Sequence, residues 1–368
     1  MRKTGFSALL AGLLALSILP ARGAEVATPN DTARFLAGLP IETGSPLAPL
    51  AKDPGWERHA RYFNSIFGQD EKTHLSKIRE FSKTRLGTTH DTMLYMFSGP
   101  DASHAVAFFP KATNYVLSAK EPVGDIPELT SLPRGAVLRT LEHLEAELHS
   151  LLSYSFFITE QMKYQLDSGP VYGALPLIYI LLARSGKTIH EMSFVNLASD
   201  GSPRPPTGPR DKATAKGVKI VFSGDDGRRQ TLYYFSTNLA DDGLKDSGFL
   251  AFCDKLGSAD SFLKSASYLL QSSNFSIVRN FILDHSATIV QDDTGIPVNY
   301  FDRKKWQLQP FGHYVMPLSI FPKAYQPQMA ELYRKGKPTP LDFGIGYRRR
   351  LNETNLILAE RIDGAKPE

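Results

Sequence analysis

The chain has 368 residues, of which 42% are hydrophobic and 22% charged, and its formal net charge is +4. This ordinary globular composition excludes a disordered tail, a collagen-like fibre and a small disulfide-stapled domain. The length suffices for one large domain or two smaller ones. No long run of lysine and arginine is present, so the charge pattern predicts no nucleic-acid partner.

The first residues have the pattern of a secretory signal peptide. Arg2 and Lys3 precede an apolar run over residues 6–19, and small residues then stand where a peptidase would cut before Ala24. The run is short for a membrane span, which needs about 20 residues. The sequence therefore predicts that residues 1–23 are removed, that the product is periplasmic or secreted, and that the mature chain has no membrane span.

The next segments are an arm and a helical region. Residues 24–56 contain five prolines and no sustained hydrophobic period, which predicts an irregular arm. Residues 57–84 are amphipathic and favour two short helices.

A βαβ unit follows. Residues 92–97 and 114–118 are apolar strand candidates on either side of a short helical segment over residues 102–109. The loop after the first strand carries Gly99, and Glu121 follows the second strand. In Rossmann-like folds an acid at this place accepts hydrogen bonds from ribose hydroxyls. The layout resembles class I methyltransferases more than dinucleotide-binding enzymes, whose fingerprint needs several glycines.

The remaining chain predicts helices and strands around this unit. A helix over residues 134–166 has one apolar stripe, and a buried helix over 173–183 completes an extra helical layer. An exposed loop over 199–216 precedes an Asp-Gly hairpin. The further elements are hairpin strands 217–222 and 230–235, helices 261–271 and 275–286, and strands 287–291, 313–321 and 341–346. We therefore expect one α/β domain over residues 57–360 with a mixed sheet and helices on its faces, followed by a tail over 361–368.

Acidic residues follow three of the predicted strands. Asp101 and Glu121 come after the first two, and Asp292 and Asp293 after a later one. If these strands are parallel, the four carboxylates meet at the carboxyl edge of the sheet, where open α/β sheets bind ligands. They are candidate catalytic residues for acid–base chemistry or ligands for Ca²⁺ or Mg²⁺. Alternatively, each only makes a turn or caps a helix.

The adjacent residues Asp292 and Asp293 should diverge, because side chains alternate along an extended chain. We expect one to face the pocket, with Asp292 favoured, and the other to brace the turn at Thr294 and Gly295.

Three further residues are candidate ligand contacts. Gly99 lies in the first loop, and Lys264 closes an S-x-x-K pattern that begins at Ser261. Trp306 is able to stack on a sugar ring, although most aromatic residues belong to the core. Cys253 has apolar neighbours and is expected to be a buried structural thiol.

Several stretches together resemble a family of exported bacterial proteins. The stretches are Phe97–Asp101, Phe108–Pro110, Glu121–Gly124, Lys264–Leu269 and Gln291–Pro297. The resemblance implies export but brings no established activity, cofactor or catalytic residue.

Two classes of function remain open. The chain is expected to bind a small polar or glycan-like ligand at the carboxyl edge of the sheet. The alternative is a periplasmic hydrolase that uses the carboxylates, with or without a divalent cation, and a degenerate methyltransferase-like domain is a third interpretation. Whether the protein is an enzyme, which cofactor it uses and which proteins it contacts are left open by the sequence.

Overall fold

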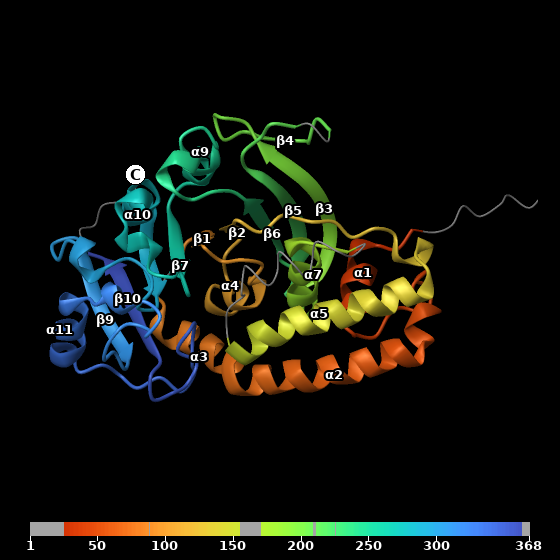
Figure 1. Cartoon of the computed structure of the whole chain (residues 1–368), viewed down its shortest axis with the longest axis horizontal. Coiled ribbons are helices and arrows are strands. Elements are labelled where there is room, and N and C mark those ends of the chain that lie inside the picture. The colour runs from red at the N-terminus through yellow and green to blue at the C-terminus, as the bar shows by residue number, and fades with distance from the viewer. Residues whose placement is uncertain (1–25, 88, 155–170, 209–210, 225, 363–368) are drawn as a thin grey trace, which may run out of the picture.

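The computed structural model describes residues 26–87, 89–154, 171–208, 211–224 and 226–362 (Figure 1). The predicted signal peptide, the second part of the predicted helix over 134–166 and most of the predicted tail lie outside these residues. Among the described residues, no helix has the length and apolar character that a membrane crossing needs.

The described strands form one ten-stranded mixed sheet in the order β4-β3-β5-β6-β2-β1-β7-β8-β10-β9. Its central strands β6, β2, β1, β7 and β8 are mutually parallel, whereas β5 and β10 are antiparallel to their neighbours. The strand bounds are β1 Thr92–Met96, β2 Asn114–Ala119, β3 Thr188–Leu197, β4 Pro203–Arg204, β5 Lys216–Ser223, β6 Arg229–Ser236, β7 Ala259–Leu263, β8 Ser286–Gln291, β9 Trp306–Gly312 and β10 Asn355–Arg361.

The central strands are buried on both faces, so two hydrophobic cores lie back to back. In β1, Met93 and Tyr95 pack into one core and Leu94 and Met96 into the other. This alternation follows from the two-residue period of an extended strand. Such strands appear in the sequence as continuous apolar runs, because helices cover both sides of a parallel sheet. The α/β class expected from the sequence is confirmed.

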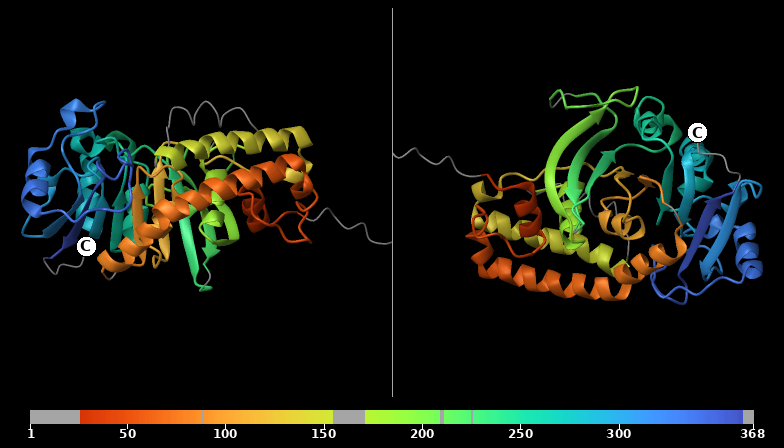
Figure 2. Two further views of the ribbon diagram at one scale, coloured as in Figure 1. Left: turned by 90° about the horizontal axis from the view of Figure 1, so that it is seen from below. Right: turned by 180° about the vertical axis from the view of Figure 1, so that it is seen from behind.

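Helices cover both faces, and the two cores divide them. The face that contains Tyr95 is covered by α1 Pro29–Leu36, α2 Pro54–Asp70, α3 Ser76–Arg85, α4 Ala102–Phe108, α5 Arg134–Tyr154 and α7 Ala174–Arg184. The other face is covered by α8 Asp241–Leu244, α9 Phe249–Lys255, α10 Ser276–His285 and α11 Pro327–Gly336. The long helices α2 and α5 lie side by side as an additional layer (Figures 1 and 2).

One predicted helix is a strand. Residues 261–271 were expected to be helical, but residues 259–263 form β7, and a short 3-10 helix follows over Leu269–Gln271. β7 is buried along its whole length between β1 and β8. The segment includes the buried polar residues Asp260 and Ser261, so it lacks the continuous apolar run that identifies a buried strand in a sequence.

The late strands also differ from the prediction. Residues 313–321 and 341–346 are not strands, and the strands of this region are β9 and β10. The segment expected to be an irregular arm contains α1, whose Thr28 and Asp31 form a capping box with Pro29 in the first turn. This pattern is a recognisable helix start.

Candidate ligand-binding site

A cavity of about 250 Å³ lies at the carboxyl edge of the parallel strands. The loops that follow β1, β2, β6 and β7 form its walls, with one residue from the C-terminal region. The lining residues are Tyr95, Phe97, Ser98, Gly99, Asp101, Ala119, Lys120, Glu121, Thr237, Leu239, Lys264, Ser265, Ala266, Ser267, Leu269, Phe275 and Tyr347.

Strand order explains why the cavity forms there. From β1 the chain crosses to β2 and β6 on one side, and it later returns to β7 and β8 on the other side. The chain therefore leaves β1 toward one side of the sheet and leaves β7 toward the other side. Ligands of open α/β sheets bind in the crevice that such a change of direction creates.

A buried polar cluster closes the inner end of the cavity. Asp101 Oδ2 lies 2.5 Å from Lys264 Nζ and accepts a hydrogen bond of 2.9 Å from the Tyr95 hydroxyl. Asp101 Oδ1 lies 2.9 Å from His104 Nδ1, which in turn lies 3.4 Å from Lys264 Nζ. All four side chains are buried. The cluster joins the ends of β1 and β7 through charge and hydrogen bonds.

The local backbone places Asp101 at this position. Phe97 and Gly99 have φ values of 64° and 56°, so the chain turns sharply after β1. Asp101 then caps α4, because its Oδ1 accepts a hydrogen bond of 3.3 Å from the main-chain N–H of His104. A left-handed conformation is costly for a phenylalanine and is typical of functional or strongly constrained sites.

The cluster shifts the protonation equilibria of its members. Burial by itself would raise the pKa of Asp101, but the positive charges at His104 and Lys264 hold that pKa well below its usual range. Burial lowers the pKa of Lys264, and the Asp101 carboxylate only partly offsets that effect. Burial likewise lowers the pKa of His104. The cluster therefore contains one firmly ionised carboxylate beside two groups that release protons more readily than usual.

Glu121 supplies an acceptor that the protein does not use. Its side chain is 4% exposed, lines the cavity, and has no hydrogen-bond partner for Oε2 among the described residues. Thr237 and Ser265 also line the cavity, and their buried hydroxyls likewise have no hydrogen-bond partner among the described residues. Buried polar atoms are almost always paired. Three residues of this cavity lining each carry one unpaired buried polar atom, which marks the lining as a candidate site for a ligand that forms hydrogen bonds.

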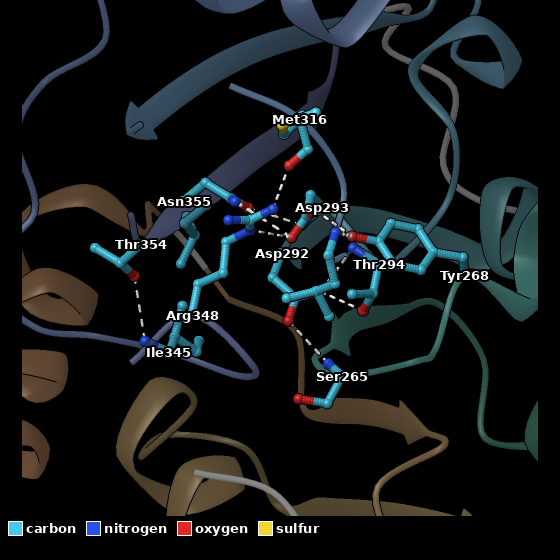
Figure 3. A network of polar contacts seen from close by, with 12 residues as sticks. Ser265, Tyr268, Asp292, Asp293, Thr294, Met316, Ile345, Arg348, Thr354 and Asn355 are labelled. Atoms are coloured by element: carbon cyan, nitrogen blue, oxygen red, sulfur yellow. Dashed lines mark hydrogen bonds and ion pairs between the residues drawn. The ribbon is translucent and has the colours of Figure 1, made fainter. Parts of the chain in front are cut away.

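Asp292 and Asp293 are not among the residues that line the cavity. Figure 3 shows them within a network of polar contacts. Asp292 accepts hydrogen bonds of 2.9 Å from the main-chain N–H groups of Thr294 and Ser265. Asp293 turns to other partners: it accepts a 2.5 Å hydrogen bond from the Tyr268 hydroxyl, and Arg348 Nε lies 3.6 Å away. The two side chains diverge as expected. The expectation that Asp292 is the pocket residue is wrong, because it braces the turn.

Asp292 has a raised pKa, although it does not line the cavity. Burial and the neighbouring Asp293 carboxylate raise the pKa of Asp292 to about 6. The backbone of Gly346 packs closely against it, because a Cβ atom at Gly346 would lie 2.2 Å from Asp292 Oδ2. Asp292 thus ties the loop after β7 to the loop that carries Tyr347 into the cavity.

The structure brings together four of the seven residues singled out in the sequence. Asp101, Glu121, Gly99 and Lys264 line the cavity. Trp306 does not: it lies in β9 at the outer edge of the sheet, is 3% exposed, and packs against Phe301.

Other members of the site were not predicted from the sequence. Tyr95 and His104 complete the cluster around Asp101, and Phe97, Phe275 and Tyr347 add aromatic walls. His104 carries a usable signal, since it stands three residues after an aspartate that begins a helix. The aromatic walls come from distant parts of the chain and have no local signal.

The described residues include no group of three or more histidine, cysteine, aspartate or glutamate side chains arranged to hold a metal ion. Comparison with known proteins finds no matching family model, no matching curated protein and no matching solved structure.

Proposed function

We propose that the protein binds a small hydroxyl-rich ligand, of the sugar or glycan-fragment class, in this cavity. The observation that carries the proposal is the unpaired, buried carboxylate oxygen of Glu121. A carboxylate is acceptor-only when ionised, so its natural partner is a hydroxyl or amine donor. The hydroxyls of Thr237 and Ser265 can both donate and accept, and they add further contacts for a polyol.

The cavity also has an apolar side that suits the carbon face of such a ligand. Phe97, Leu239, Leu269 and Phe275 contribute to its walls. Apolar walls with a few convergent polar groups are typical of small-molecule sites. The volume of about 250 Å³ limits the bound portion to a small molecule, such as one sugar ring.

A nucleoside is the second candidate, and the strand order favours it. The central order β6-β2-β1-β7-β8 is that of a doubly wound nucleotide-binding sheet, and Glu121 stands where such folds hold the ribose hydroxyls. The antiparallel strand β10 departs from the parallel order of dinucleotide-binding domains. This favours the methyltransferase-like layout over the dinucleotide-binding one.

Glu121→Gln tests the site directly. The amide keeps the size of the side chain but replaces one acceptor oxygen by a donor. A hydrogen bond to a charged group contributes about 1.5–3 kcal/mol, so ligand affinity should fall roughly 10- to 100-fold. The variant should be about as stable as the wild type, because the side chain keeps its size and Oε2 makes no hydrogen bond that the substitution would remove.

The measurement is a thermal-shift and calorimetric screen with monosaccharides, sugar alcohols and nucleosides. Glu142→Gln is the matched control, because Glu142 is an exposed glutamate on α5. A ligand that binds wild type and both variants equally would contradict a role for Glu121. Binding of nucleosides but not sugars would select the second candidate.

We also propose that the protein acts outside the cytoplasm, as the signal-peptide pattern of residues 1–23 predicts. Mass spectrometry of the native protein should show an amino terminus at or near Ala24. Recovery of the intact chain from the cytoplasm would contradict export.

A further inference from the structure

Lys264 is a buried lysine in the lining of the cavity, with charged groups around its ammonium group. Its side chain is 3% exposed, yet it lines the cavity together with Glu121, Thr237 and Ser265. Its ammonium group faces Asp101 at 2.5 Å and His104 at 3.4 Å, and the charges of Arg349 and Asp292 also act on it.

An ion pair at this place is poorly explained by stability alone. Two charges lose their hydration on burial, and replacement of a buried pair by apolar residues is often neutral or stabilising. Here the pair borders a cavity instead of filling a core. A desolvated amine with an adjacent proton acceptor is the arrangement that activates lysine as a nucleophile toward carbonyl carbons.

We propose that Lys264 forms an imine with a small aldehyde or ketone, such as an open-chain sugar, bound in the cavity. This inference rests on the proposed function, because the carbonyl compound occupies the same site. Ser265 and Thr237 also line this cavity and carry unpaired hydroxyls, which would bind the carbonyl oxygen or the neighbouring hydroxyl groups of the ligand.

The step balances without an oxidant or reductant. Lys264 first gives one ammonium proton to His104, whose Nδ1 lies 3.4 Å from Lys264 Nζ, and the neutral amine attacks the carbonyl carbon. A C–N bond forms and the oxygen becomes a hydroxyl by taking up that proton. The nitrogen atom then gives one of its two protons to this hydroxyl, the C–O bond breaks, and the oxygen leaves as water. The products are one protonated imine and one water molecule.

Reductive trapping in the wild-type protein tests the proposal. The protein is incubated with glycolaldehyde or dihydroxyacetone and cyanoborohydride at pH 6–10, and modified lysines are mapped by peptide mass spectrometry. Lys120 is the internal control, because it lines the same cavity but is exposed. At pH 7 Lys264 should be modified more than Lys120, because burial lowers the pKa of Lys264 and so leaves more of it as the neutral amine.

Modification of Lys264 that does not exceed that of Lys120 at any pH would overturn the proposal. The same preparation is tested for binding of a sugar alcohol, which has hydroxyls but no carbonyl group. Sugar-alcohol binding that Glu121→Gln weakens, together with unmodified Lys264, refutes only the imine. If the wild-type protein neither binds the sugar alcohol nor is modified at Lys264, the ligand-binding proposal is refuted as well.

Discussion

Replacing Asp101 with asparagine should destabilise the fold by about 3–5 kcal/mol, because it leaves Lys264 as a buried charge without its counter-ion. Asp101 Oδ2 is 2.5 Å from Lys264 Nζ and accepts a hydrogen bond from Tyr95, and all these groups are buried. Asparagine preserves the side-chain oxygen that caps α4 at His104, so loss of the cap contributes little. Since folded domains have about 5–15 kcal/mol of stability, the effect is large.

The assay is urea unfolding of the wild type, Asp101→Asn, Lys264→Met and the double variant. Lys264→Met should be less harmful than Asp101→Asn, because His104 and Tyr95 still contact the remaining carboxylate. The double variant has no unpaired lysine, so its loss should be well below the sum of the single losses. Single losses under about 1 kcal/mol, or strict additivity, would refute the reasoning.

Three further experiments test other buried groups of the protein. Burial and Asp293 raise the pKa of Asp292 to about 6, so its protonation stabilises the fold below pH 4 and that contribution is lost as the pH rises through 6. Unfolding free energies at pH 4.5 and 7.5 should therefore show wild type losing stability relative to Asp292→Asn at the higher pH, and parallel profiles would contradict this. Gly346→Ala should be costlier than Gly186→Ala in thermal unfolding, because both have positive φ but only Gly346 would clash, at 2.2 Å from Asp292 Oδ2; equal losses would contradict the close packing. Burial raises the pKa of the Cys253 thiol, so a thiol reagent such as Ellman's reagent should label it only after unfolding, and rapid native labelling would show that it is accessible.

Local patterns in the sequence determined much of the scaffold. The strands β1, β2 and β8, the hairpin of β5 and β6, and the buried helix α7 were all predicted close to their observed bounds. Each has a signal within its own segment: a continuous apolar run, an Asp-Gly turn, or a helix ended by Gly186 with φ of 70°. The same signals placed Asp101 and Glu121 directly after parallel strands, where both line the cavity.

Only the tertiary structure decided which of these residues meet. Lys264 pairs with Asp101 across 163 positions of sequence, because β7 returns to lie beside β1. Asp292 was expected in the pocket, but the backbone N–H groups of Thr294 and Ser265 draw its carboxylate into the turn. Strand order and side-chain direction depend on pairing between distant segments and on competition for buried donors. Neither strand order nor side-chain direction produces a periodic pattern in the sequence. The tertiary packing therefore decides which residues form the site.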